Sequence, residues 1–365
     1  MTWFNIQNIR KFVMLWLIIC FTGSINLFAQ ARPDTNELHH FRLLAFGTYI
    51  EVMISGGSKK RAHQARNLVS QKFKAMHHQW HSTHDSAVSR LNRLLPSNAW
   101  VALPPVVREL LIRSKEISIL SQHKFNPAIG KLVNIWGFNN ALKPRSKPPL
   151  ASTIDTHTRQ QARMSDVQIQ GGRIRSTNPA VQLDFGAIAK GYAIDQVVRL
   201  LQKQGFKNLI INAGGDLKAI GRRPGRAWRI AVRDPSKQSR VIAGIKIINE
   251  EAVFTSGDYE RYFIHKGTRY HHIIDPATGY PAQHTRSVTI IHKNATLADA
   301  AATALFIAGP KNWADTAKKM GIRYVMLIDN KGIIHLSRAM QNRIQLLGKK
   351  RQRTQVRELN SQHSR

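Results

Sequence analysis

Runs of alternating apolar and polar residues give way to helical spacing within the first eighty positions. Residues 41–54, FRLLAFGTYIEVMI, alternate on both sides of Gly47, which predicts two strands joined by a turn. Over residues 61–80 apolar side chains such as Phe73 and Met76 recur every three or four positions. This segment is therefore predicted to be an amphipathic helix.

The pattern is less regular over the next hundred residues. A helix is expected over about 105–120, after two prolines, and another over about 154–164. Short strands are expected at 167–169 and 173–175. Residues 86–92, SAVSRLN, are expected to form a polar loop or turn.

The stretch from Val181 to Asp195, VQLDFGAIAKGYAID, combines three signals. An apolar, strand-like run ends at Asp184, a Gly/Ala turn follows, and an Ala-rich helix extends to a cap at Gly205. Unpaired N–H groups at such a helix N-terminus suit a phosphate, and Lys190 adds a cation. The alternative is a plain strand-to-helix corner capped by Asp184.

The second half of the chain is rich in short strands, with two helices near its end. The Ala-rich helix over 297–308 is stopped by Gly309-Pro310, and a further helix is expected over 313–320. Strands are expected at 208–211, 228–232, 241–248, 251–255, 287–292, 324–329 and 333–336, with a strand pair formed by 259–263 and 270–276.

The chain is strongly basic, with a formal net charge of +34. Such a field attracts nucleic acids, anionic membrane surfaces and phosphorylated small molecules alike. A basic surface is also compatible with a general solubility strategy. No zinc-finger spacing or aromatic RNA-binding motif accompanies the charge, which argues against a nucleic-acid function.

The N-terminus has the features of an export signal. Basic residues precede an apolar run, and Ala29-Gln30-Ala31 offers a small-x-small cleavage site. Cleavage there would remove Cys20, the only cysteine, and exclude disulfides. A lipoprotein anchored at Cys20 is a weaker alternative, because the bulky Ile19 precedes it. We expect a signal peptide over 1–31, a polar linker over 32–40, one domain over 41–347 and a basic, disordered tail over 348–365.

Polar side chains on the later elements offer further chemistry. Asp299 and Thr303 are four residues apart on the 297–308 helix, so they share a face and could ligate Mg²⁺, whereas the more usual alternative for such a pair is a solvated surface. His272 could act as a general base, or be a strand histidine bonded to a carbonyl. His77 and His81 have metal-ligand spacing but no carboxylate in register, which favours a polar helix end.

Seven segments, in this order, resemble the ApbE family of flavin transferases. They are FGTYIEV (46–52), FNPAIGKLVNIWGF (125–138), LDFGAIAKGYAID (183–195), NAGGD (212–216), TSGDYERYF (255–263), HIIDPATGYP (272–281) and ADAAATALFIAG (298–309). The resemblance covers nearly all of the chain after the signal segment.

The resemblance implies a single α+β domain with mixed or antiparallel sheets packed by helices. It also implies an enzyme that binds FAD with Mg²⁺, transfers the FMN half to a Thr or Ser hydroxyl of a target protein and releases AMP. Targets in the family are subunits of membrane redox pumps on the periplasmic face of the inner membrane. Alternatives are an FAD pyrophosphatase that uses the same site with water, or a flavin-binding protein without turnover.

The resemblance also implies site residues. The metal ligands would be the Ala187 carbonyl, Asp299 and Thr303, and His272 would be the catalytic base. FAD would contact Asp184, Lys190 and Ile273, with Phe125, Asn126 and Phe46 as lesser wall residues. The loop at 83–92 departs from the family pattern, since it is shorter and places His84 where a flavin-stacking tyrosine is usual.

Overall fold

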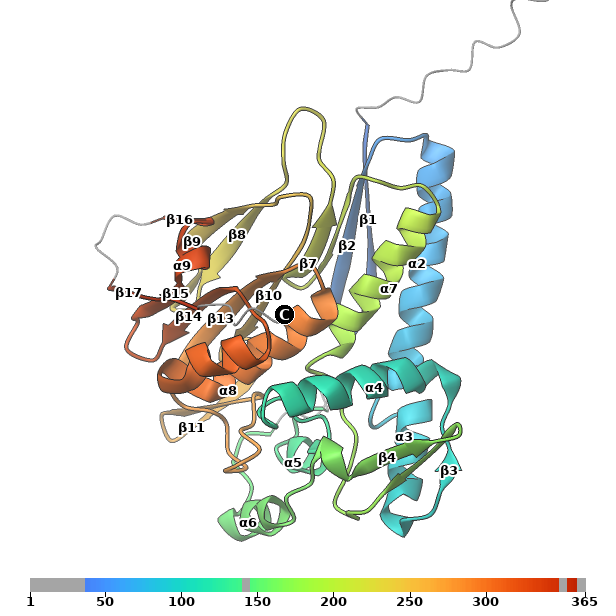
Figure 1. The fold of residues 1–365 in the computed structure, drawn as a ribbon, viewed down its shortest axis with the longest axis vertical. Helices are drawn as coiled ribbons and strands as arrows, with labels where there is room; N and C mark the ends of the chain where they lie inside the picture. The colour runs from blue at the N-terminus through green and yellow to red at the C-terminus, as the bar shows by residue number, and fades with distance from the viewer. Residues whose placement is uncertain (1–36, 140–144, 348–352, 360–365) are drawn as a thin grey trace, which may run out of the picture.

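A nine-stranded sheet crosses the molecule in the computed structural model, which describes residues 37–139, 145–347 and 353–359 (Figure 1). Neighbouring strands are antiparallel except for the last pair, which is parallel. The spatial order is β1 (Leu38–Ala45), β2 (Thr48–Ser55), β6 (Leu209–Ala213), β7 (Asp216–Ile220), β10 (Glu250–Gly257), β13 (Thr285–His292), β14 (Tyr324–Asp329), β15 (Ile334–Ser337) and β17 (Thr354–Arg357).

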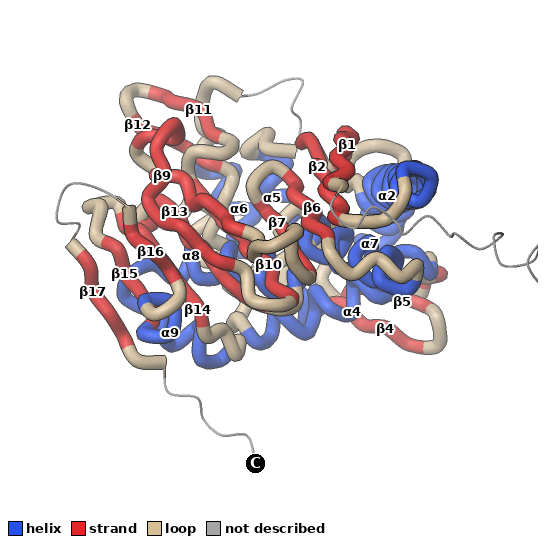
Figure 2. Tube along the Cα trace, turned by 90° about the horizontal axis from the view of Figure 1, so that it is seen from above, coloured by secondary structure: helices blue, strands red, loops and turns tan. Residues whose placement is uncertain are grey.

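Three long helices cover one face of this sheet: α2 (Lys59–Trp80), α7 (Ala189–Lys203) and α8 (Ala295–Lys319) (Figure 2). Many of the residues that α8 buries are alanines, and such small side chains allow the helix to lie close to β10 and β13. The helix kinks at Gly309, whose φ of 69° and ψ of 178° are not helical, so the predicted break at Gly309-Pro310 is confirmed.

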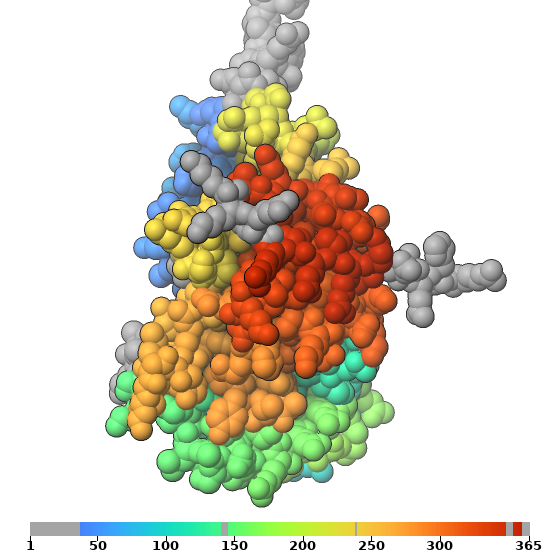
Figure 3. All heavy atoms as spheres, turned by 90° about the vertical axis from the view of Figure 1, so that its left-hand side faces the viewer, coloured from blue at the N-terminus to red at the C-terminus, as the bar shows by residue number. Residues whose placement is uncertain are grey.

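A smaller antiparallel sheet covers the other face, in the order β16 (Ile344–Leu346), β9 (Lys237–Lys246), β8 (Arg229–Asp234). Its apolar side chains, including Trp228 and Ile245, form a second core with Val253 and Ile291 of the large sheet. The middle of the large sheet is therefore covered on both faces, and five consecutive residues of β13, Ser287 to Ile291, are buried although only three of them are apolar. Figure 3 shows the β8–β9 segment, in yellow, at the surface of the molecule.

Most of the remaining elements lie at one end of the large sheet, in the lower part of Figure 1, whereas α9 (Arg338–Gln341) lies beside β14 and β15. These remaining elements are α3 (Ala87–Leu94), β3 (Val101–Ala102), α4 (Pro105–Leu120), α5 (Gly130–Ile135), α6 (Ala151–Arg159), β4 (Val167–Gln170), β5 (Arg173–Ser176), β11 (Tyr262–His265), β12 (Thr268–His271) and α9, with short 3₁₀ turns at Leu95–Ser97 and Met164–Asp166.

The predicted α+β class is confirmed, but three local predictions are wrong. Residues 86–92 are helical, because Ser86 and Ser89 form a reciprocal capping box that starts α3. The helix expected over 154–164 runs instead from Ala151 to Arg159. The strand expected at 181–183 makes only a single bridge, Ile129 to Gln182.

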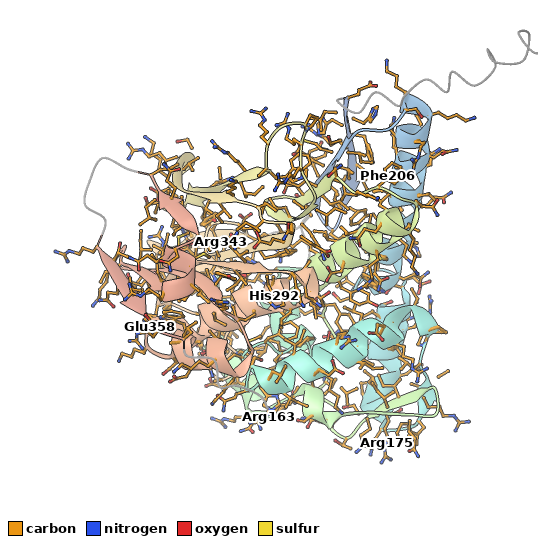
Figure 4. All side chains as sticks on the ribbon, turned by 45° about the horizontal axis from the view of Figure 1, so that its top comes forward. Arg163, Arg175, Phe206, His292, Arg343 and Glu358 are labelled. Atoms are coloured by element: carbon orange, nitrogen blue, oxygen red, sulfur yellow. The ribbon has the colours of Figure 1, made fainter. Side chains whose placement is uncertain are left out.

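The predicted boundaries also change at both ends of the domain. Strand β1 begins at Leu38, so the end of the expected linker belongs to the sheet. Part of the expected disordered tail forms β17, which pairs with the otherwise open edge of β15. Glu358, just after β17, accepts a hydrogen bond from Arg338 at 2.8 Å (Figure 4). The expected signal peptide, with Cys20, and residues 348–352 and 360–365 lie outside the described residues.

Candidate functional site

A cavity of about 770 Å³ opens where the N-terminal end of α7, the ends of β7 and β10 and the segment after β12 meet. This volume is ordinary for a small-molecule site. All but one of the residues expected at the site line it: Phe46, Phe125, Asn126, Asp184, Ala187, Lys190, His272, Ile273, Asp299 and Thr303. Segments far apart in sequence thus contribute to a single cavity. The exception is His84.

The turn before α7 is fixed by Asp184. Its Oδ1 accepts a hydrogen bond from the Gly186 N–H and its Oδ2 accepts one from the Ser82 hydroxyl, both at 2.8 Å. Asp184 therefore caps this turn and ties it to the end of α2, whereas α7 itself begins after Ile188 without a side-chain cap. Ala187 lies within the held turn, on the cavity wall.

Helices α7 and α8 cross closely at Gly191. A Cβ atom at this position would lie 2.3 Å from the Ala295 carbonyl oxygen and 2.8 Å from the Cβ of Asp299. The Gly191 N–H donates to Asp299 Oδ2 at 2.8 Å. One N–H group of the α7 first turn, expected to serve a phosphate, is therefore used to hold Asp299.

Lys190 and Asp216 form an ion pair at the cavity wall. Asp216 Oδ1 also accepts a hydrogen bond from the Thr255 N–H at 2.9 Å, which anchors the pair to β10. Burial alone would lower the pKa of Lys190, but Asp216 and Asp299 outweigh it and raise the pKa. The lysine is therefore a permanent cation in the cavity.

Asp299 is buried in an environment that disfavours its charge. Burial raises its pKa to about 7, and the nearby Asp216 acts in the same direction, while Lys190 and the Gly191 N–H oppose it. A divalent cation would remove this penalty. Because Oδ2 is bonded to Gly191, Oδ1 is the oxygen that could bind such an ion.

The donor set around Asp299 fits Mg²⁺. Thr303 lies one turn further along α8, with its hydroxyl 3.3 Å from that of Ser256, and Ala187 offers a carbonyl oxygen. These are hard oxygen donors of the kind that Mg²⁺ prefers. Within the described residues no group of three or more His, Cys, Asp or Glu side chains could hold a metal, so water and substrate phosphates would complete the shell.

His272 follows β12 and is held through its backbone and its ring. Its N–H donates to the Arg261 carbonyl at 3.0 Å, and Nδ1 lies 3.3 Å from the same oxygen. A carbonyl can only accept, so Nδ1 carries the proton and Nε2 is left basic. Burial lowers the pKa of His272 well below 6.5, helped by Arg261, His271 and Lys190. The imidazole is therefore neutral near pH 7.

His84, which was expected to stack on the flavin, does not line the cavity. The His84 ring stacks on His81, with centroids 3.9 Å apart, and it is His81 that lines the cavity. Phe46 packs edge-on against His77, whose Nδ1 accepts the Phe46 N–H at 3.2 Å. His77 therefore supports the β1–β2 turn, and the polar helix end is the better interpretation of this histidine pair.

Several cavity residues carry charge that the sequence analysis did not assign to the site. Arg261 donates to the Phe138 carbonyl at 3.1 Å and interacts electrostatically with Asp184. Glu260 and Arg233 also line the cavity. Arg261 and Glu260 belong to the segment TSGDYERYF, so their position in that motif was the available signal, whereas Arg233 had none.

A buried ion pair behind the cavity fixes the start of α8. Asp195 of α7 accepts hydrogen bonds from Lys218 Nζ at 2.9 Å, the Thr296 N–H at 2.9 Å and the Thr296 hydroxyl at 2.7 Å. The carboxylate thus caps the α8 N-terminus, where a negative charge is favourable. This network sets the position of α8 relative to α7 and β7.

Comparison with known proteins places these features in a family. The model of the ApbE family matches residues 46–326. The chain is 35% identical over 326 residues to the FAD:protein FMN transferase of Rhodobacter capsulatus, covering 88% of this chain and 61% of that relative's length. It is 32% identical over 251 residues to the Vibrio cholerae protein of the same name, covering 67% of this chain and 73% of the relative.

Solved structures give the same result. The ApbE protein of Thermotoga maritima superposes with a TM-score of 0.76 at 32% identity, over 84% of this chain and 99% of that one. The flavinyl transferase ApbE of Pseudomonas stutzeri, in its apo form, superposes with a TM-score of 0.72 at 30% identity, over 84% and 96%. None of the helices in residues 37–139, 145–347 and 353–359 combines the length and the hydropathy of a membrane span.

Proposed function

Because this chain belongs to the ApbE family, we propose that it transfers the FMN half of FAD to a Ser or Thr hydroxyl of another protein and releases AMP. One observation carries the proposal. Lys190, His272, and the pair Asp299 and Thr303 of α8 come from three separate segments and line a single cavity of about 770 Å³. These are the groups that a pyrophosphate cleavage requires.

The reaction breaks one bond and forms one. The acceptor hydroxyl oxygen attacks the FMN phosphorus, the pyrophosphate P–O bond breaks, and AMP leaves with the bridging oxygen. The hydroxyl proton passes to Nε2 of His272, which is neutral and is oriented by the bond of Nδ1 to Arg261. Lys190 stays charged and offsets the negative charge of the phosphates.

We assign the metal role to Asp299 Oδ1, the Thr303 hydroxyl and the Ala187 carbonyl. Bound Mg²⁺ would neutralise the pyrophosphate and polarise its oxygens. The Gly191 N–H keeps the Asp299 carboxylate directed to one side. His81, Phe46 and Trp80 offer an aromatic wall for the isoalloxazine ring.

The test is incubation with FAD, Mg²⁺ and a candidate acceptor subunit, with mass spectrometry for an FMN adduct and chromatography for AMP. Asp299→Ala should abolish Mg²⁺-dependent AMP release. Full activity in that variant would remove the metal assignment. AMP release without any adduct on acceptor proteins would instead favour an FAD pyrophosphatase, and FAD binding without AMP release a flavin carrier.

We also propose that the enzyme acts on the periplasmic side of the inner membrane, on a subunit of a membrane redox complex. The basic, apolar and small-x-small order of residues 1–31 supports export. Fractionation of cells that express the full chain, with N-terminal sequencing, tests this. A cytoplasmic protein that keeps Met1 would contradict it.

A further inference from the structure

Strand β8 forms one edge of the small sheet and also borders the cavity. Among the described residues it pairs with β9 alone. Four consecutive residues, 230–233, line the cavity. Since successive side chains of a strand point to opposite faces, a run of consecutive lining residues means that the cavity follows the open edge of β8 rather than one face.

The alternation of hydrogen-bonded and non-bonded residue pairs between β8 and β9 shows which backbone groups of β8 face its open edge. The Ile247 N–H donates to the Trp228 carbonyl at 3.0 Å, and the register continues as Ile230↔Ile245 and Ala231↔Gly244. Bonded and non-bonded pairs alternate in an antiparallel ladder, so Ile230 bonds to β9. The N–H and C=O of Ala231 therefore point away from β9, towards the open edge.

The hydrogen bonds between β9 and β16, on the opposite side of β9, lead to the same assignment. The Leu347 N–H donates to the Ile242 carbonyl at 2.8 Å, so Ile242 bonds towards β16. Its neighbour Ala243 then bonds towards β8, in register with Val232. Ala231 itself is exposed, and an open edge with unpaired backbone groups can template another strand.

The charge around the open edge of β8 indicates which kind of peptide segment could pair with it. Residues 221–246, which contain β8 and β9, carry a single acidic residue, Asp234, and many basic ones: Arg222, Arg223, Arg226, Arg229, Arg233, Lys237, Arg240 and Lys246. Arg233 is exposed and lies at the cavity wall. An acidic segment is therefore electrostatically complementary to this surface.

We propose that the acceptor protein docks by adding an extended, acidic segment to the open edge of β8, which delivers its Ser or Thr hydroxyl into the cavity. This inference rests on the proposed function and names the chemistry of its partner. Main-chain bonds to Ala231 would supply affinity with little demand on acceptor side chains, and alternate residues of the segment would face the cavity.

The experiment uses the full-length enzyme, FAD, Mg²⁺ and a displayed library of 12-residue peptides with a central threonine. Peptides that acquire FMN are isolated by flavin fluorescence and sequenced. We expect enrichment of Asp and Glu around the threonine. The best peptide is then resynthesised with single backbone N-methyl groups, which remove one N–H each.

If the peptide adds as a strand, only every second backbone N–H of the peptide should bond to β8, so the effect of N-methylation should alternate along the peptide. N-methylation at alternate positions should raise the peptide KM about tenfold, as expected for one lost hydrogen bond, and the intervening positions serve as matched controls. Ala231→Pro removes the outward N–H from the enzyme side and should raise the KM similarly. A proline is tolerated where the N–H of an edge strand faces outward. The FAD dissociation constant, measured on the same sample, reports whether the variant is folded.

Three results would overturn docking at the β8 edge. These are equal losses at all N-methyl positions, enrichment of basic peptides, and transfer of FMN to an intact acceptor protein with no peptide labelled. A parallel loss of FAD affinity in folded Ala231→Pro would assign the edge to the nucleotide and overturn it as well. An enzyme that neither releases AMP nor labels any peptide would instead contradict the proposed function itself.

Discussion

The close contact between α7 and α8 at Gly191 allows a direct test of whether the helix crossing determines the position of Asp299. In Gly191→Ala the new methyl group would lie 2.3 Å from the Ala295 carbonyl oxygen, whereas ordinary contacts begin at 3.4 Å. The difference, 3.4 − 2.3 = 1.1 Å, is the separation that α7 and α8 would have to gain there. Asp299 would move with α8, while Ala187 and Lys190 would stay with α7.

The expected effects on stability and on activity differ in size. Overpacking costs about 1–3 kcal/mol, and the better helix propensity of alanine returns about 1 kcal/mol, so the free energy of unfolding should fall by about 0–2 kcal/mol. A displacement of about 1 Å between catalytic groups can cost about 100-fold in rate. We therefore expect a folded protein with about 1% of the AMP release rate.

The assay combines urea unfolding with initial rates of AMP release at several concentrations of FAD and Mg²⁺. Arg199→Ala, on the exposed side of the same helix, is the control and should change the unfolding free energy by less than about 0.5 kcal/mol. Wild-type activity in folded Gly191→Ala would refute the reasoning, because the helix crossing would then not determine the position of Asp299.

Three other predictions follow from groups near the site. His272→Ala should slow FMN transfer by about 10²–10⁴-fold with little change in FAD affinity, and unchanged transfer would refute the base role. Since burial keeps the pKa of His272 well below 6.5, and bound Mg²⁺ keeps Asp299 ionised, the wild-type rate at saturating Mg²⁺ should stay level from pH 8 to 6.5. Burial lowers the pKa of His271 to about 4, so the unfolded state, with a pKa of 6.5, takes up the proton first. Stability should therefore fall as the pH drops from 6.5 to 4, by at most about 3 kcal/mol, and chemical denaturation of His271→Gln should show a shallower fall. Asp195→Asn removes the buried carboxylate that caps α8, while Lys218 keeps its second partner, Glu250, at 2.7 Å. The loss should be about 1.5–3 kcal/mol, as for hydrogen bonds to a charged group, and a loss below about 1 kcal/mol by the same method would contradict the proposed support of α8.

Sequence patterns predicted the elements whose signals are local. The strands around Gly47, the helix at 61–80 and the break at Gly309-Pro310 all appear close to their expected positions. The errors occur where the signal is tertiary. In residues 86–92 the Ser86–Ser89 capping box starts a helix whose apolar side chains are buried by neighbouring elements, and β17 forms because β15 offers it an edge.

The candidate site also combines features that the sequence predicted with features that only the tertiary structure shows. The sequence by itself determined which residue types are present, and the ordered motifs indicated which of them belong together. Only the tertiary structure decided that Lys190 pairs with Asp216, that Gly191 holds Asp299, that His81 rather than His84 faces the cavity, and that the edge of β8 lies beside it. Helical and strand periods fix which side chains share a face of one element, but the approach of two elements depends on packing between residues more than a hundred positions apart.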